Sequence, residues 1–128
     1  MLTFKNNNPV EIGIIEQQPS FNIKGFQYHT NQKDWSQNLM TCHLKIELIF
    51  SDTKKNELGK ISDTLSLEQF ILPQHIQPYY NNLNLNKSFE KFIPMNKSDK
   101  ISECKILISI VNFIFFENDT IDLDLQII

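Results

Sequence analysis

The sequence contains no alanine and no arginine, and it has only three glycines, two cysteines and two valines. The lack of alanine bears on the fold, because alanine is the best helix former, whereas the abundant isoleucine and phenylalanine favour strands. The lack of arginine removes the side chain that binds phosphates through two parallel hydrogen bonds. Two cysteines do not make a disulfide framework in a chain of 128 residues. These absences favour a β-rich fold without covalent cross-links.

Positive charge is also scarce. Twelve lysines oppose fifteen aspartates and glutamates, which leaves a formal net charge of −3. This balance argues against a nucleic-acid partner, because phosphate binding needs a basic face. The sequence has no run of 18 apolar residues, so we predict no membrane span, and residues 1–9 lack the apolar core of a secretory signal. We therefore predict one cytoplasmic domain over residues 1–128.

Alternation of apolar and polar residues predicts several strands. The clearest runs from Met40 to Phe50, where the even positions are apolar and the odd positions from Thr41 to Glu47 are polar. One face of this strand is expected in the core and the other in water, as an antiparallel sheet allows. Shorter alternations over residues 10–14 and 21–28 predict two further strands.

The last third of the chain predicts a hairpin. Residues 104–116 are apolar on both parities, which is typical of a central strand that is covered on both faces. Residues 121–127 alternate isoleucine and leucine with polar side chains, so they predict a half-exposed final strand. The sequence Glu117-Asn118-Asp119 between the two segments predicts a turn.

A short helix is expected over residues 65–72, because Thr64 is a suitable N-cap and Pro73 would end the helix. Residues 30–37 predict a polar loop, and residues 74–100, with two prolines and several asparagines, predict an irregular segment. The fold class is therefore mainly β. We expect five to six mostly antiparallel strands, arranged as a sandwich or as a curved sheet with one short helix.

The side chains that support catalysis or metal binding do not form recognisable motifs. The histidines and cysteines, none of which has a partner at zinc-ligand spacing, are His29, His43, His75, Cys42 and Cys104. A Gly-x-Ser-x-Gly elbow and a glycine-rich phosphate loop are absent, and the acidic residues after position 118 lack the glycine and glutamate of a calcium loop. We predict a protein that is not an enzyme and uses no cofactor and no metal.

Two sets of side chains are candidates for binding a protein partner. The aromatic residues in polar segments, whose rings could anchor a partner, are Trp35, Tyr79 and Tyr80. Their alternative role is to fold back over the edge of the core. The acidic residues, which would attract a basic partner, are Asp63, Glu68, Asp122 and Asp124. The alternative for this set is a solvated surface that only aids solubility.

Residues 21–72 resemble the front part of WapI-like bacterial immunity proteins. The similarity consists of a strand over 21–28, a polar link to residues 33–40, a long alternating strand, and residues 63–70, which open a short helix. The resemblance implies a cytoplasmic antitoxin that binds and blocks one cognate toxin domain without catalysis. It implies no particular site residues, because such surfaces are specific to each pair.

Three classes of function remain open at this point. The first is a non-enzymatic protein-binding module of the immunity type. The alternative is a structural or accessory subunit of a larger assembly, such as a phage tail or a secretion machine, because an incompletely covered strand at 104–116 would need a partner. A small nucleic-acid-binding β-barrel that stacks bases on phenylalanine and tyrosine is the third class, and the net charge disfavours it.

Overall fold

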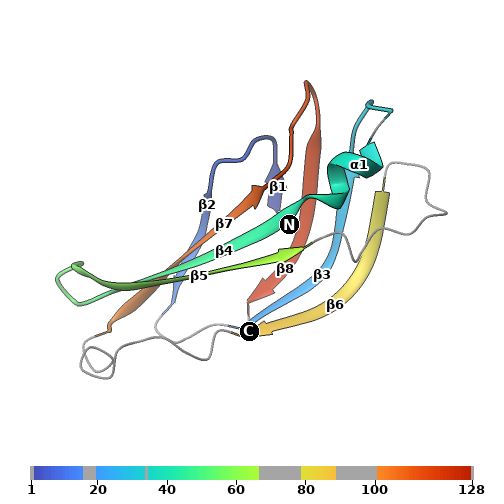
Figure 1. Cartoon of the computed structure of the whole chain (residues 1–128). Coiled ribbons are helices and arrows are strands. Elements are labelled where there is room, and N and C mark those ends of the chain that lie inside the picture. Colours follow the sequence, from blue (N-terminus) through green and yellow to red (C-terminus); the bar gives the residue numbers. More distant parts are fainter. Residues whose placement is uncertain (1, 16–19, 34, 67–78, 89–100, 128) are drawn as a thin grey trace.

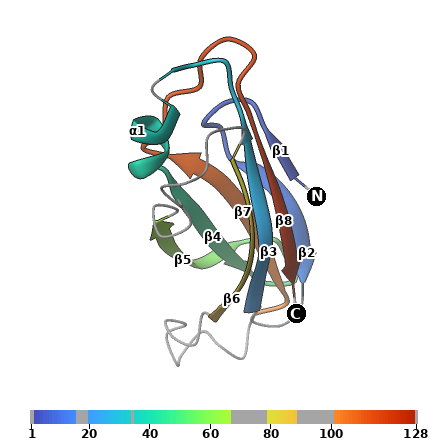
Figure 2. The same ribbon diagram turned by 90° about the vertical axis from the view of Figure 1, so that its right-hand side faces the viewer.

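Antiparallel strands make up most of the computed structural model of the chain (Figure 1). The structure describes residues 2–15, 20–33, 35–66, 79–88 and 101–127. Within these residues the strands form two four-stranded sheets, and the predicted β-rich class is confirmed. Figure 2 shows the sheets as two layers, with the short helix α1 (Trp35–Met40) near one end.

The first layer, sheet A, contains both the first and the last strand of the described chain. Its strands, in spatial order, are β1 (Leu2–Phe4), β8 (Thr120–Ile127), β3 (Ser20–His29) and β6 (Tyr79–Ser88). Every pairing in this sheet is antiparallel. The register of β3 shifts between Ile23 and Gly25, at the position where the apolar residues of this segment change parity.

The second layer, sheet B, is built around a central pair of strands. Its strands, in spatial order, are β2 (Val10–Ile15), β7 (Glu103–Val111), β4 (His43–Ser51) and β5 (Glu57–Ser66). All of these pairings are antiparallel as well. The predicted central position of the strand that begins near residue 104 is therefore confirmed, because β7 lies between β2 and β4. The predicted cover on both of its faces is wrong, because Lys105 on the outer face is exposed.

The core lies between the two sheets. In β4, the even-numbered residues Leu44, Ile46, Leu48 and Phe50 are buried, as their alternation predicts. They belong to one hydrophobic cluster with the inward residues of β7 and with residues of sheet A. Burial of apolar surface from both layers is the main stabilising force of such a sandwich.

The predicted helix over residues 65–72 is wrong at its start. Leu65 and Ser66 are the last residues of β5 and pair with Leu44 and His43. Residues 67–72 lie outside the described residues. Exposed and half-buried residues alternate in β5 from Lys60 to Leu65, and β5 pairs with β4 along its length, so tertiary pairing overrides the capping signal at Thr64.

The helix occurs earlier in the chain, where a loop is predicted. In α1, Leu39 is buried, whereas Met40 is 48% exposed and lies outside β4. The assignment of Met40 to the core face of the strand is therefore wrong. The burial of even-numbered residues begins at Cys42, so Met40 fits the alternation in sequence but not in the structure.

The predicted hairpin between the last two strands is also wrong. β7 ends at Val111, and β8 belongs to the other sheet. Residues 112–119, termed the β7–β8 connection below, cross from sheet B to sheet A. The predicted irregular segment contains β6 over residues 79–88, so the described residues form eight strands rather than five or six.

Candidate interaction surface

The β7–β8 connection exposes two large apolar side chains. Phe113 is buried and Phe115 packs beside it, with 4.8 Å between their ring centroids. Phe113 also contacts the ring of Tyr28 edge-on, at a centroid distance of 5.0 Å. The intervening residues face the other way, so that Ile114 is 63% exposed and Phe116 is 42% exposed. The alternation that packs Phe113 and Phe115 against the core thus places an isoleucine and a phenylalanine in solvent.

Helix α1 holds this connection in place. The Asn38 side chain makes two hydrogen bonds with the backbone of Ile114: its Nδ2 donates to the carbonyl oxygen at 2.7 Å, and its Oδ1 accepts from the amide nitrogen at 3.0 Å. The hydroxyl of Thr41 donates to the carbonyl oxygen of Asn112 at 2.8 Å. Side chains of α1 and of the residue that follows it therefore replace the backbone partners that a strand would supply here.

Asparagines fix the two bends of the connection. Asn112 and Asn118 have φ angles of 55° and 68°, in the left-handed region that asparagine tolerates better than most residues. The side-chain amide of Asn7 donates to the carbonyl oxygens of Ile110 and Phe113, at 2.9 and 3.0 Å. The exposed apolar residues thus stand on a backbone that is fixed from both sides.

Asp119 anchors the end of the connection from inside the protein. It is 3% exposed and accepts hydrogen bonds from the hydroxyls of Tyr28 (2.9 Å) and Thr30 (2.7 Å) and from the amide nitrogen of Phe116 (3.2 Å). Burial is the main cause that raises the pKa of Tyr28 above its ordinary value. Three donors thus hold this buried carboxylate, so Asp119 has a structural role at the base of the connection.

An open hollow of about 420 Å³ adjoins the exposed ring of Phe116. Lys5 and Glu117 give it charged walls, and Thr120 contributes a hydroxyl. A hollow next to a rigid apolar side chain suits the side chain of a protein partner, because interface anchors commonly insert into such depressions. We take Ile114, Phe116 and this hollow together as the candidate interaction surface.

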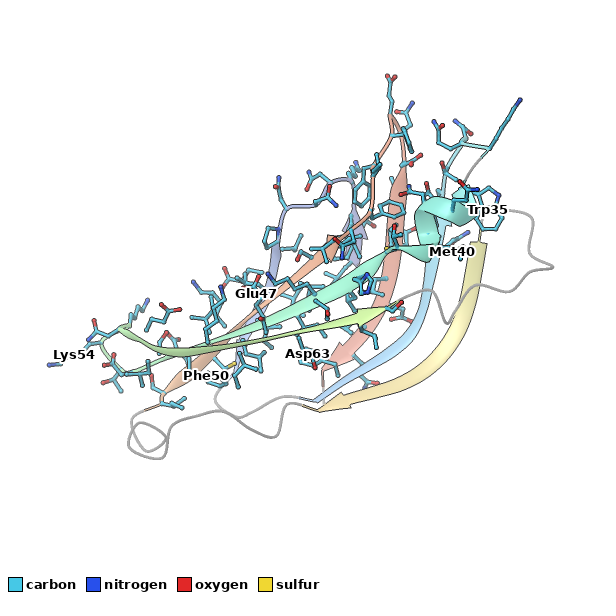
Figure 3. The ribbon with its side chains drawn as sticks, in the orientation of Figure 1. Trp35, Met40, Glu47, Phe50, Lys54 and Asp63 are labelled. Carbon is cyan, nitrogen blue, oxygen red and sulfur yellow. The ribbon has the colours of Figure 1, made fainter. Side chains whose placement is uncertain are left out.

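The predicted aromatic set is divided by the structure. Trp35 is the first residue of α1 and packs, partly buried, against the hydrophobic core, so this ring folds back over the core edge. Figure 3 shows it at the end of the molecule opposite the turn that carries Lys54. Tyr79 and Tyr80 lie in strand β6, opposite Tyr28 and Gln27, and not in a loop. The structure describes the backbone of these two residues but not their side chains.

The predicted acidic set does not form one surface. Asp63 lies on β5 of sheet B, at the register position of the buried Ile46 and therefore on the core side of an edge strand. Asp122 and Asp124 lie on β8 of sheet A, where Asp124 is exposed. Glu68 lies outside the described residues. The structure thus separates the acidic side chains between the two sheets.

A histidine, an aspartate and a threonine meet on the outer face of sheet A. Asp122 accepts a 2.7 Å hydrogen bond from the hydroxyl of Thr3 through Oδ1, and its Oδ2 lies 3.0 Å from Nε2 of His29. In a catalytic triad the histidine lies between the nucleophile and the acid, so that it can take the proton of the nucleophile. Here the aspartate is the central group. This order ties β1 to β3 across β8 and does not activate the threonine.

Both thiols are buried in the hydrophobic core, Cys104 on β7 and Cys42 directly before β4. Desolvation by burial raises the pKa of Cys42 to about 12 and that of Cys104 to about 11, so both remain protonated at neutral pH. A protonated, buried thiol is a poor nucleophile and a poor metal ligand. Among the residues that the structure describes, no three histidine, cysteine, aspartate or glutamate side chains gather as a metal site would require.

Sequence reasoning missed Ile114 and Phe116, because both belong to an apolar run that is typical of a buried strand. The signal that could have revealed them is Asn112, a polar residue inside that run, directly after the last residue of the strand.

No helix among the described residues is long and apolar enough to cross a membrane. Comparison of the chain with family models, curated proteins and solved structures found no match.

Proposed function

We propose that the chain is a non-enzymatic protein-binding module, and specifically a cytoplasmic antitoxin that neutralises one cognate toxin domain by direct binding. The observation that carries the proposal is the exposure of Ile114 and Phe116 on a fixed backbone. Exposed apolar side chains that cluster on a soluble domain are characteristic of protein interfaces.

Preorganisation of the β7–β8 connection strengthens this reasoning. Binding a partner costs conformational entropy wherever a loop or a side chain must be ordered. Here hydrogen bonds from Asn38, Thr41 and Asn7 already order the backbone, and Asp119 holds its end. Contacts made by Phe116 would therefore translate into affinity with little entropic loss, as expected of an interface anchor.

The chemistry of the described residues supports a binding role over a catalytic one. The carboxylate between His29 and Thr3 has the wrong position for a triad, and the thiols of Cys42 and Cys104 are protonated. The resemblance of residues 21–72 to WapI-like immunity proteins supports the more specific antitoxin role. The candidate surface is formed by Lys5 and residues 114–120, outside the segment that carries the resemblance, as expected of a surface that differs from pair to pair.

The test is co-expression of the chain with the protein encoded by the adjacent gene, scored by cell growth and by co-purification. We expect the neighbour to arrest growth alone, and the intact chain to restore growth and to co-purify with it. Replacing both Ile114 and Phe116 by serine should abolish protection. Val10→Ser, which changes another exposed apolar side chain, is the matched control and should protect fully.

Two results would contradict the antitoxin proposal. A toxic neighbour that the chain neither binds nor neutralises would remove the immunity role. A harmless neighbour that co-purifies through Ile114 and Phe116 would instead support the alternative of an accessory subunit in a larger assembly. Full protection by the double-serine variant would show that the interface lies elsewhere on the molecule.

A further inference from the structure

The outer face of sheet B carries charged residues in rows that cross the strands. Residues that pair across β5, β4, β7 and β2 share a row, and successive rows on this face lie two residues apart along β4 and β7. Register shifts in β5 and β2 lengthen the step to three residues there, from Glu57 to Lys60 and from Glu11 to Ile14. The charged residues of four successive rows are Glu57 and Glu103, then Lys60 and Lys105, then Glu47 and Glu11, then Lys45. The charge therefore alternates from row to row: negative, positive, negative, positive.

Ion pairs within the chain link neighbouring rows. Glu47 is 6% exposed, and its carboxylate lies 2.7 Å from the ammonium of Lys60 and 3.6 Å from that of Lys45. Figure 3 shows Glu47 on β4 in the middle part of the sheet. Lys105 and Glu11 are exposed, and neither takes part in an ion pair among the described residues. Lys105 and Glu11 thus keep charge that another molecule can meet.

The row pattern is complementary to itself. A two-fold axis that runs parallel to the rows, between the lysine row of Lys60 and the glutamate row of Glu47, exchanges these two rows between two copies. The same axis brings the row of Glu57 onto the row of Lys45. Each charged row of one copy then faces a row of opposite sign in the other, which is the condition for a symmetric interface. An axis placed on a row would instead oppose rows of the same sign.

We propose that the outer face of sheet B is the interface of a symmetric dimer of this chain. Ile49 and Leu107, both half-buried, lie in the two central rows and supply apolar contacts at the middle of the interface. The four rows contain four carboxylates and three ammonium groups, so two copies that meet here carry little net repulsion. The dimer uses a face that is separate from the candidate interaction surface on the β7–β8 connection.

The size of the face predicts a weak dimer. Four strands about 4.8 Å apart and four rows about 6.8 Å apart cover about 500 Å² on each copy. The total of about 1,000 Å² is at the low end for specific interfaces, so we expect a dissociation constant of about 10–100 µM at low salt. Because charged rows supply much of the attraction, 500 mM salt should raise this constant at least tenfold over its value at 20 mM.

Charge exchange between Lys105 and Glu11 tests the arrangement. In the dimer, β7 of one copy lies opposite β7 of the other, so Lys105 lies next to Glu11 on the adjacent strand β2 of the other copy. Lys105→Glu alone and Glu11→Lys alone should each raise the dissociation constant at least tenfold, because like charges then meet twice. A mixture of the two variants should form a heterodimer with close to the original affinity, since both contacts are then attractive again. The doubly exchanged chain should regain the homodimer.

Sedimentation equilibrium at 5–500 µM protein is the measurement, with the fluorescence of the single tryptophan as the check that each variant is folded. Dimerisation that follows the charge exchange supports the proposal. A monomer at 500 µM in 20 mM salt overturns it, and so does a dimer that is insensitive to the exchanges. Weakening by both single variants without recovery in the mixture would exclude this two-fold arrangement. The salt dependence of the unmodified chain tests the proposal even where a variant fails to fold.

Discussion

Replacing Asp119 by alanine should destabilise the protein more than any change to an exposed acid. Asp119 is buried and accepts hydrogen bonds from Tyr28, Thr30 and the backbone of Phe116. Alanine leaves these donors without their acceptor, and the Tyr28 hydroxyl is buried while the other two are partly buried. Thr30 keeps one contact, because its hydroxyl oxygen still accepts from the amide nitrogen of Gln32 at 3.0 Å.

The magnitude follows from the cost of unsatisfied donors. Each buried donor that loses its acceptor costs about 1–3 kcal/mol, and neighbouring losses are not additive. For three donors we expect a loss of about 3–5 kcal/mol in the free energy of unfolding. Asp119→Asn keeps one acceptor oxygen and should cost about half as much. Tyr28→Phe removes a single hydroxyl and should cost about 1–2 kcal/mol.

Urea denaturation followed by tryptophan fluorescence measures these losses, because Trp35 lies on the helix that contacts the same network. Asp124→Ala is the matched control: Asp124 is an exposed acid on β8, and its removal should change stability by less than about 0.5 kcal/mol. If Asp119→Ala costs no more than the control, the buried network does not stabilise the fold, and the reasoning about the β7–β8 connection fails with it.

Three further predictions concern the core, the thiols and the outer face of sheet B. Leu48→Ala should cost about 2–5 kcal/mol in urea denaturation, because Leu48 is fully buried; a cost below 1 kcal/mol would contradict the placement of the core. At pH 8 a thiol reagent should label neither Cys42 nor Cys104 in the folded protein and both after unfolding; rapid labelling of the native chain would refute their burial. Lys60 lowers the pKa of Glu47 below its ordinary value of 4.5, so the carboxylate stabilises the folded state fully above pH 4.5 and progressively less below it. Glu47→Gln should therefore lower the denaturation midpoint at pH 7, and its difference from the unmodified protein should narrow as the pH falls below 4.5; a constant difference would count against the ion pair.

The strands that have one face in the core and the other in water were predicted correctly from the sequence. In β4 the buried Leu44 and the half-exposed Lys45 follow the expected parity, and in β8 the buried Leu123 and the exposed Asp124 do the same. Such patterns are local, because each residue is sorted by polarity between core and water. The central position of β7 was also predictable from its apolar run, although only its inner face is fully buried.

The errors arose where distant segments decide the structure. Leu65 follows a helix-capping signal in the sequence but pairs with Leu44 of β4, a partner that local pattern does not identify. The expected hairpin fails because Asn112 adopts a left-handed conformation and sends the chain to the other sheet. Neither decision is encoded in the periodicity of the segment itself.

The candidate surface was the least predictable part. Exposure of Ile114 depends on the hydrogen bonds that Asn38 makes across 76 positions of sequence, and no composition rule anticipates such a contact. The acidic residues were identified by charge alone, and charge does not show that Asp63 and Asp122 belong to different sheets. Position in the fold, rather than residue type, decides which side chains support the structure and which are accessible to a partner.

Strand β1 pairs with β8, so that Leu2 lies opposite Leu123. During synthesis, residues 2–4 must wait for a partner strand that leaves the ribosome more than a hundred residues later. Sheet A therefore closes only after translation of this region has finished, and its slow step is the meeting of segments from opposite ends of the chain. Until then β3 lacks the strand that pairs with it along its β8 edge, and an unpaired strand edge of this kind favours aggregation of the nascent chain.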